Sequence, residues 1–249
     1  MKLCFDNVCK SFQETAAVRN ISFKVEPGEF AALAGPSGSG KTTILNLASG
    51  LDHPTSGRVT LLGHDLKQLT ETERTDLRRK SVGFVFQSYN LLSVLTAVEN
   101  IEYPLALQQI PARKRRREAI EMLDCVGLGQ LGNRRPHQLS GGQQQRVAVA
   151  RALAIRPEII FADEPTANLD SQSAERLLEL FQSLSESRGI TFLFSSHDSR
   201  VLKLAKRILY VSDGTIHEQT NRFRISDSSP HPQIDKGGGR PHVGPPRNQ

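Results

Sequence analysis

The sequence is poor in cysteine and has no long apolar run, and each absence excludes a class of protein. Its cysteines, Cys4, Cys9 and Cys125, are odd in number and lack metal-ligand spacing, so we interpret them as reduced thiols of a cytosolic protein. No apolar run approaches the roughly 18–20 residues that span a bilayer, and MKLCFDNVCKSF at the start lacks the apolar core of a signal peptide. We therefore expect any membrane-spanning part to belong to another chain.

Positive charge is in small excess and is uneven along the chain. Lys and Arg number 32 against 26 Asp and Glu, a net charge of +6 in 249 residues. Residues 221–249 hold five basic and two acidic residues, so they supply +3 and leave +3 for residues 1–220. That remainder is too small to indicate nucleic-acid binding. The one dense basic cluster, RKRRR at 113–117, is either a solvated helix face or a contact with anionic lipid heads.

Apolar patterning predicts strands near both ends of the chain and helices from about residue 88 to 155. Runs typical of strands occupy 1–27, 29–35, 56–66, 81–87, 158–165 and 190–198, and a hairpin is expected over 208–218. The runs at 158–165 and 190–198 are nearly continuous, as expected for parallel strands buried on both faces. Helical spacing marks 42–51, 112–128, 141–155 and 173–188, and in 112–128 it places Ile120, Leu123 and Val126 on one face. The tail over 221–249 is rich in Pro, Gly and Ser, so we expect it to be disordered and basic.

The stretch GPSGSGKT at 35–42 matches G-x-x-x-x-G-K-[ST], the glycine-rich loop that binds phosphate. It lies between a predicted strand and a predicted helix, a context that a chance glycine turn does not explain. Backbone N–H groups of such a loop turn toward an anion, and the helix N-terminus adds positive partial charge. Lys41 is then the cation for the β and γ phosphate oxygens, and Thr42 offers a hydroxyl to Mg²⁺. The predicted nucleotide-binding residues here are Gly35, Pro36, Ser37, Gly38, Ser39, Gly40, Lys41, Thr42 and Thr43.

Polar residues end three further runs that we predict as central strands. Asp163 ends IIFAD and is a candidate Mg²⁺ ligand, directly or through water, while Glu164 is suited to orient and deprotonate the attacking water. Gln87 and His197 follow their strands at the edge where an open parallel sheet binds ligands. We predict that Gln87 contacts Mg²⁺ or the water and that His197 donates to the γ-phosphate. The alternative is a set of ordinary surface residues at strand ends.

A second glycine-containing motif, LSGGQQQR at 139–146, raises the question of which phosphate it meets. The helix from Gln143 begins just after Ser140, Gly141 and Gly142, so its N-terminus presents N–H donors. The helical insert separates this loop from the core. We therefore expect a second copy of the chain, related by two-fold symmetry, to present it to the γ-phosphate bound by the first copy. The alternative is a capped helix start with no role beyond folding.

Together these motifs resemble those of ABC-type ATPase subunits over about residues 1–220. LSGGQ lies between the phosphate loop and FADEPT, and NLD and SSHD follow. The resemblance implies an α/β fold, in which a P-loop RecA-like core carries an N-terminal antiparallel β subdomain and an inserted α-helical subdomain at about 88–155. It implies hydrolysis of ATP with Mg²⁺ by a head-to-tail homodimer, or by a paired ATPase subunit. It also implies an integral-membrane permease partner, a peripheral place on the cytoplasmic face of the inner membrane, and no nucleic acid.

The resemblance also implies roles for residues outside the phosphate loop. Asp170 ends ANLD at 167–170, the loop that crosses between subunits in this family, and an aromatic residue near position 12 stacks on adenine. Here that residue is Phe12, where the family often has Tyr. The stretches GFVFQSYNLLSVLTAVENIEYPL and DEPTANLD look most like the lipoprotein-releasing and macrolide-export ATPases, although Ala167 stands where that group usually has Gly.

Other functions share part of this pattern. The ATPase of an amino-acid importer shares the core, and only the SYNLLS and TANLD details count against it. A soluble chromosome-maintenance or DNA-repair ATPase needs a long coiled coil between the two loops, whereas this insert has about fifty residues and no sustained heptads. A translation-factor ATPase needs two copies of the motif set, and the chain has one.

The helical insert follows Gln87, so we expect it to dock the permease and to respond to the γ-phosphate. Leu91, Leu92, Val94 and Leu95 are the candidates for a groove that receives a permease helix. The alternative for these four residues is packing within the core.

Truncation after Gln219 should leave folding and ATPase activity unchanged, because the composition of the removed segment does not support a packed structure. Circular dichroism and steady-state ATP hydrolysis of the truncated and full-length chains check this. Loss of most activity would show that the tail contributes to a site.

Overall fold

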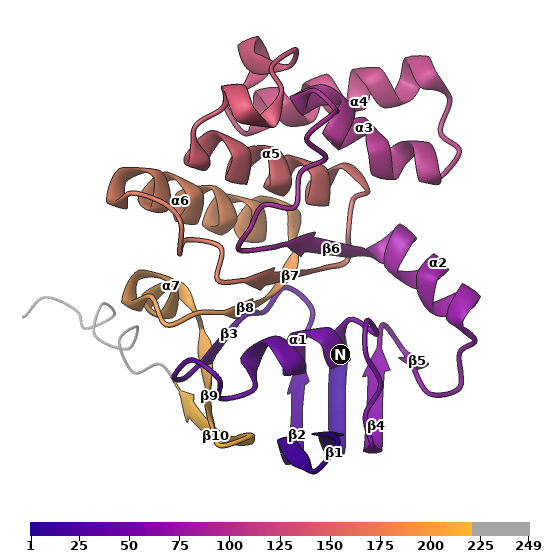
Figure 1. The fold of residues 1–249 in the computed structure, drawn as a ribbon, viewed down its shortest axis with the longest axis vertical. Helices are drawn as coiled ribbons and strands as arrows, with labels where there is room; N and C mark the ends of the chain where they lie inside the picture. The colour runs from indigo at the N-terminus through magenta and orange to yellow at the C-terminus, as the bar shows by residue number, and fades with distance from the viewer. Residues whose placement is uncertain (221–249) are drawn as a thin grey trace, which may run out of the picture.

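The computed structural model describes residues 1–220, with the backbone alone at 218–220. The tail expected over 221–249 lies outside the described residues. Within the described part the strands form two sheets (Figure 1), and the predicted α/β class is confirmed. The strands are β1 (Leu3–Phe12), β2 (Thr15–Val25), β3 (Phe30–Ala34), β4 (Ser56–Leu61), β5 (His64–Asp65), β6 (Val82–Val85), β7 (Ile159–Asp163), β8 (Thr191–Ser195), β9 (Arg207–Ser212) and β10 (Thr215–Thr220).

The larger sheet has six strands in the order β10-β9-β3-β8-β7-β6. All neighbours from β9 to β6 pair in parallel, and β10 returns antiparallel to β9 as the hairpin that the Asp213–Gly214 turn predicts. The smaller sheet, β2-β1-β4-β5, is antiparallel throughout and contains the N-terminal strands. Because β10 runs to Thr220, a truncation after Thr220 would preserve the whole hairpin.

Helices cover both faces of the parallel sheet, and α3 and α4 stand apart from it (Figure 1). The α-helices are α1 (Lys41–Ala48), α2 (Glu71–Ser81), α3 (Ala97–Leu107), α4 (Ala112–Cys125), α5 (Gly141–Ala154), α6 (Ser171–Arg188) and α7 (Ser199–Leu204), with 3₁₀ turns η1 (Gly129–Leu131) and η2 (Pro136–Gln138). In Figure 1, α3 and α4 lie at the end farthest from the antiparallel sheet, with α5 between them and the parallel sheet. None of the helices in residues 1–220 is long and apolar enough to cross a membrane.

Three apolar clusters hold these layers together. One joins the antiparallel sheet and α1 to one face of β3, β7 and β8, and a second joins the other face to α5, α6 and α7. Strands buried on both faces account for the continuous apolar runs in the sequence, since neither face meets water. The third cluster lies among α3, α4 and α5 and gives the helical segment a core of its own.

Two sequence expectations fail for an identifiable physical reason. The apolar patterns used above single out nothing over 71–81, yet α2 forms there with a Thr70–Glu73 capping box. It buries none of its side chains fully, so it lacks the apolar stripe by which a helix is recognised. Ile120 was predicted to share one apolar face with Leu123 and Val126, but it is 45% exposed, while Ala119 and Leu123 are buried in α4.

The basic cluster of residues 113–117 lies on α4 and is largely paired with acids. Arg116 contacts Glu102 of α3 at 3.1 Å, and Arg117 lies 3.7 Å from Glu121 one turn along α4. These ion pairs stabilise the α3–α4 pair by small amounts.

Phe181→Ala should lower the free energy of unfolding by about 3–5 kcal/mol, because it leaves a cavity beneath α6. Phe181 is fully buried, and its ring meets the edges of Phe192 and Phe194 at 5.5 and 5.2 Å between centroids. Urea unfolding checks the value, with Leu51→Ala at a half-exposed position as the control. A loss no larger than the control's would show that this part of the core is not tightly packed.

Candidate functional site

A pocket of about 530 Å³ opens at the carboxyl ends of β3, β6, β7 and β8. In a parallel sheet these ends share one edge, so segments far apart in the sequence meet there. The pocket is lined by Ala17, Pro36, Ser37, Gly38, Gly40, Lys41, Thr42, Thr43, Gln87, Asp163, Glu164, Ser195 and His197. The phosphate loop and the four polar strand-end residues predicted from the sequence therefore surround one cavity.

The phosphate loop turns between β3 and α1 at positions that only glycine fits. Gly40 caps α1 with a left-handed φ of 107°, and a Cβ there would lie 2.6 Å from the Ala17 carbonyl oxygen. A Cβ on Gly35 would lie 2.1 Å from the carbonyl oxygen of Val211. The loop is thus pressed against β2 and β9, which aims the free N–H groups of the first turn of α1 into the pocket.

Lys41 lies across this loop as a nearly buried cation. Its Nζ donates to the carbonyl oxygens of Gly35 and Pro36 at 2.8 and 2.9 Å and lies 4.0 Å from Glu164 Oε1. The ammonium is held where it can exchange carbonyl acceptors for phosphate oxygens, which are stronger acceptors because they are charged.

Oxygen atoms suited to a divalent cation gather beside Lys41. The Thr42 hydroxyl donates to Asp163 Oδ2 at 3.0 Å, and Asp163 Oδ1 is buried without a hydrogen-bond partner. Hydroxyl, carboxylate and amide oxygens are ligands that Mg²⁺ accepts, and Gln87 lines the same pocket. No group of three or more His, Cys, Asp or Glu within residues 1–220 is placed to hold a metal ion by itself. The protein groups therefore fit a Mg²⁺ ion that arrives with phosphate ligands of its own.

Glu164 is held in an unusual conformation next to Asp163. Its φ is 44°, a left-handed value that costs energy for a residue with a side chain, and such strain clusters at functional sites. Its backbone N–H donates to the Ser195 carbonyl at 2.8 Å. Its Oε1 lies 2.9 Å from Nδ1 of His197, and its Oε2 is buried with no hydrogen-bond partner. Glu164 lines the pocket, and a carboxylate in that position can accept a proton from water.

The Ser140–Gln143 loop does not line this pocket, as expected from the helical insert. Ser140 caps α5: its Oγ accepts from the Gln143 N–H at 3.3 Å, and Gln143 Oε1 accepts from the Ser140 N–H at 2.9 Å. This capping box satisfies part of the helix start within the chain. The loop is thus a formed helix N-terminus outside the pocket of its own chain.

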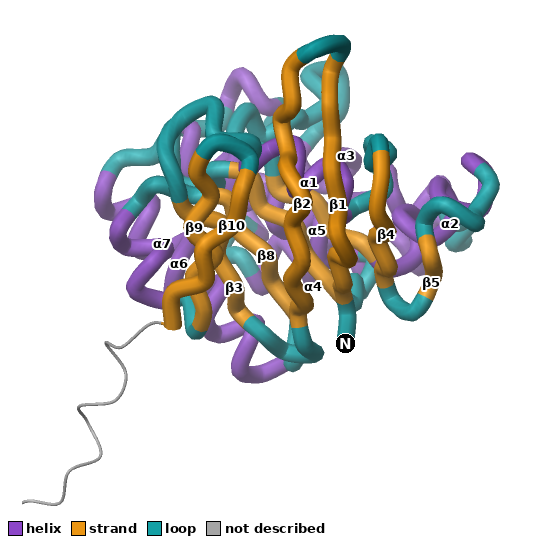
Figure 2. Tube along the Cα trace, turned by 90° about the horizontal axis from the view of Figure 1, so that it is seen from below, coloured by secondary structure: helices purple, strands orange, loops and turns teal. Residues whose placement is uncertain are grey.

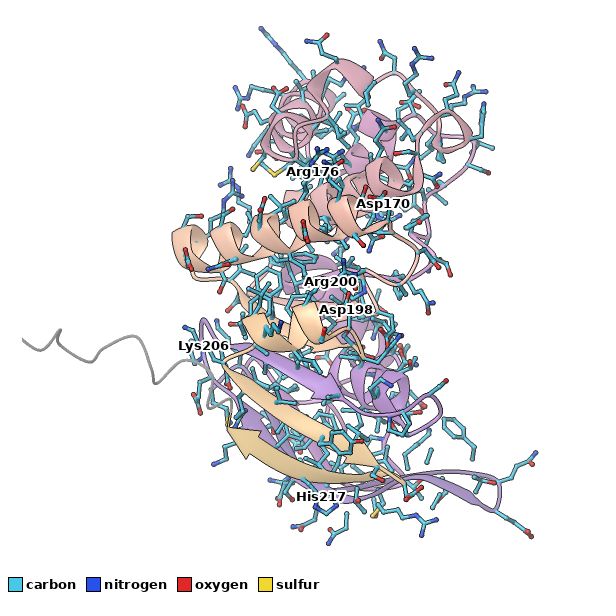
Figure 3. All side chains as sticks on the ribbon, turned by 90° about the vertical axis from the view of Figure 1, so that its left-hand side faces the viewer. Asp170, Arg176, Asp198, Arg200, Lys206 and His217 are labelled. Carbon is cyan, nitrogen blue, oxygen red and sulfur yellow. The ribbon has the colours of Figure 1, made fainter. Side chains whose placement is uncertain are left out.

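Asp170 and Phe12 also lie outside the pocket lining. Asp170 caps α6, and hydrogen bonds from the Ser173 hydroxyl and N–H hold the pKa of its carboxyl below the usual range. In Figure 3 it lies above Asp198 and Arg200, at the start of α7, and Arg200 donates to the Ser171 carbonyl at 3.4 Å. Phe12 presents a half-exposed ring at the end of the β1–β2 hairpin seen in Figure 2, with the Lys10 ammonium 4.8 Å from its centroid.

Several contributors to the site escaped the sequence patterns. Ala17 contributes through its backbone carbonyl, for which a side-chain pattern carries no signal. Ser195 lines the pocket with an unpaired hydroxyl, and its position two residues before His197 in SSHD was a usable signal. Tyr89 donates to the Asn168 carbonyl at 3.3 Å, and Asn168 Nδ2 donates to the Gln87 carbonyl at 2.9 Å. This pairing joins segments some eighty positions apart and exists only in the folded chain.

Comparison with known proteins places this arrangement in a family. The family model described as ABC transporter matches residues 18–167. An uncharacterized ABC transporter ATP-binding protein of Methanocaldococcus jannaschii is 47% identical over 213 residues, which are 86% of this chain and 95% of that protein. The chain belongs to the ABC transporter family as one of its ATP-binding subunits, which hydrolyse ATP.

Two further likenesses bear on assembly. The macrolide export ATP-binding/permease protein MacB of Syntrophobacter fumaroxidans is 46% identical over 225 residues, 90% of this chain but 31% of that protein. A solved structure, the dimeric post-hydrolysis state of the ATP-binding cassette MJ0796 bound to ADP and Pi, matches with a TM-score of 0.81 and 41% identity. That match covers 88% of this chain and 98% of that one.

Proposed function

We propose that this chain hydrolyses ATP with Mg²⁺ at the pocket described above. The convergence of Lys41, Thr42 and Asp163 with a strained Glu164 is the observation that supports it best. Lys41 and the first turn of α1 bind the phosphates, and Thr42, Asp163 and Gln87 hold Mg²⁺, which supplies charge neutralisation when bound. Glu164 orients and deprotonates the attacking water, and His197, beside Glu164 Oε1, donates to the γ-phosphate.

We further propose a head-to-tail dimer in which each Ser140–Gln143 loop faces the nucleotide bound by the other copy. The loop is a helix N-terminus outside its own pocket, so its donors are available to a second chain. The related cassette MJ0796 has a solved dimer bound to ADP and Pi, which supports the same assembly here. In this arrangement Phe12 stacks on adenine and Asp170 lies in the segment between the subunits.

Glu164→Gln should lower the rate of ATP hydrolysis by ~10²-fold or more, because the amide cannot accept the proton. ATP should still bind through Lys41, Thr42 and Asp163. The variant should therefore sediment as a dimer with ATP and Mg²⁺ and as a monomer without nucleotide, measured by analytical ultracentrifugation.

Ser140→Arg in the Glu164→Gln background is the matched control, because it adds bulk where the partner's γ-phosphate must lie. It should abolish the dimer while leaving ATP binding to the monomer intact. A Glu164→Gln protein that binds ATP tightly yet stays monomeric at high concentration would contradict the proposal that two copies share each nucleotide site. The Ser140 loop would then be only a helix start.

We propose that the permease docks in an apolar groove of about 340 Å³ between the end of β6 and the helical segment. Its lining includes Leu92, Tyr103 and Leu107, which are 39%, 47% and 49% exposed. Exposed large apolar side chains around one groove are typical of a protein–protein contact. Of the four residues expected from the sequence, Leu92 lines the groove, Val94 is 74% exposed, and Leu91 and Leu95 are half-buried.

The partner is proposed to be a separate permease of the lipoprotein-release or macrolide-export type, with this chain peripheral on the cytoplasmic face of the membrane. The name of the related MacB protein couples an ATP-binding part with a permease, which supports this choice. An amino-acid importer is the alternative, and purification of the complex with the permease encoded beside this gene distinguishes the two. Nucleic acid has no part in the proposal.

Leu92→Glu and Leu107→Glu should reduce stimulation of ATP hydrolysis by the permease at least several-fold, because each places a charge in the apolar contact. Stimulated and unstimulated rates are measured with permease in detergent, and Ile120→Glu, an equally exposed apolar residue outside the groove, is the control. Normal co-purification and stimulation of both groove variants would place the docking surface elsewhere.

A further inference from the structure

Helix α5 carries two polar side chains that donate hydrogen bonds to the turns that follow β7 and β6. Gln145 is fully buried, and Arg151 is half-buried two turns further along. Neither side chain contacts the nucleotide pocket. Each donates to backbone carbonyls of a turn that carries a residue of the proposed reaction.

Gln145 holds the turn that follows Glu164. Its Nε2 donates to the Pro165 carbonyl at 2.9 Å, while its Oε1 is buried with no hydrogen-bond partner. A buried amide with one unpaired oxygen is unfavourable for stability, so folding alone does not explain it. Pro165 directly follows Glu164, whose left-handed backbone needs support from its surroundings. The hydrogen bond from Gln145 to the Pro165 carbonyl holds the turn after Glu164. The hydrogen bond from the Glu164 N–H to the Ser195 carbonyl holds the turn at Glu164 itself.

Arg151 holds the turn that follows Gln87. Its guanidinium donates to the Asn90 carbonyl at 2.5 Å and to the Tyr89 carbonyl at 3.0 Å. Both of these residues have left-handed φ values, 62° at Tyr89 and 48° at Asn90. Burial lowers the pKa of the guanidinium from its ordinary value, and its hydrogen bonds go to carbonyls in place of a carboxylate. One side chain therefore holds two adjacent residues that have left-handed backbone conformations. This fixes the path of the backbone just after Gln87.

We propose that Gln145 and Arg151 are positioning residues through which α5 sets the geometry of Glu164 and of Gln87. This rests on the catalytic roles proposed above for those two residues. The helix that begins at Ser140 then contacts both catalytic turns of its own chain. A displacement of α5 by a second copy's nucleotide at Ser140 moves the supports of the base and of Gln87 together.

The first test replaces Gln145 with Met, which keeps the volume and removes the donor. We expect kcat to fall by roughly 10-fold to 100-fold with KM for ATP unchanged, because a misplaced base impairs the chemical step and not binding. Gln108→Met is the control: its Nε2 also donates to a backbone carbonyl, that of Arg79, which belongs to neither turn. Rates are normalised to ATP bound per chain, and thermal unfolding is recorded for each variant. A purely structural role would lower the unfolding temperature and leave the normalised kcat at the control's value, which would overturn the proposal.

The second test compares Arg151→Lys with Arg151→Met. Lys keeps the charge and part of the carbonyl contact, so its normalised kcat should lie between those of the wild type and Met. The Mg²⁺ concentration for half-maximal activity should rise several-fold in Arg151→Met, because Gln87 is displaced. Wild-type kcat and Mg²⁺ dependence in Arg151→Met would overturn the proposal.

Glu164→Gln, assayed alongside, separates the two levels of inference. Wild-type turnover in Glu164→Gln would refute the proposed function itself. An inactive Glu164→Gln together with a fully active Gln145→Met would refute only the positioning roles. In the Glu164→Gln background, Gln145→Met should still form the ATP-dependent dimer, because the bond acts on the base and not on the subunit contact.

Discussion

The parallel pairing of β7 with β8 is the constraint on which the rest of the site depends. It places Asp163 opposite Ser195, and one residue further Glu164 donates its N–H to the Ser195 carbonyl. The pairing thereby brings Asp163, Glu164 and His197 to one edge of the sheet. Because both strands are buried on both faces, their register cannot slip without exposing apolar side chains to water. The positions of Glu164 and His197 are thus held by core packing.

Next to this edge of the sheet lies the side-chain cation of Lys41, which is almost fully buried. Lys41 is 7% exposed, and its ammonium is held by the carbonyl oxygens of Gly35 and Pro36. A buried charge paired only with neutral carbonyls and a carboxylate 4.0 Å away gains from a stronger anionic partner. The same site leaves oxygens of Asp163 and Glu164 without partners. Under the proposed function, a phosphate with its cation would supply partners for both Lys41 and these oxygens, so the unfavourable burial of these groups would favour binding.

Helix α5 relates this edge to the surface where a second copy is proposed to bind. Its N-terminus carries the Ser140 capping box, and its middle and end hold the turns after Glu164 and Gln87. A helix is stiff along its axis, so a shift at one end is carried to the other. The groove proposed for the permease includes Arg151 as well, which places the docking surface one side chain away from the turn after Gln87.

The sequence by itself determined the local chemistry of this protein. The phosphate loop, the carboxylates after β7 and the capped start of α5 are each set by neighbouring residues, because glycine conformation, strand burial and capping are local properties. Helix α2 and the outward face of Ile120 were missed, since a helix with no fully buried side chain has no apolar stripe and one face of a short helix is ambiguous. Only the tertiary structure decided which carbonyls Gln145 and Arg151 reach and that Tyr89 meets Asn168. Those contacts join segments twenty to about eighty residues apart, whose meeting depends on how the helical segment packs on the sheet.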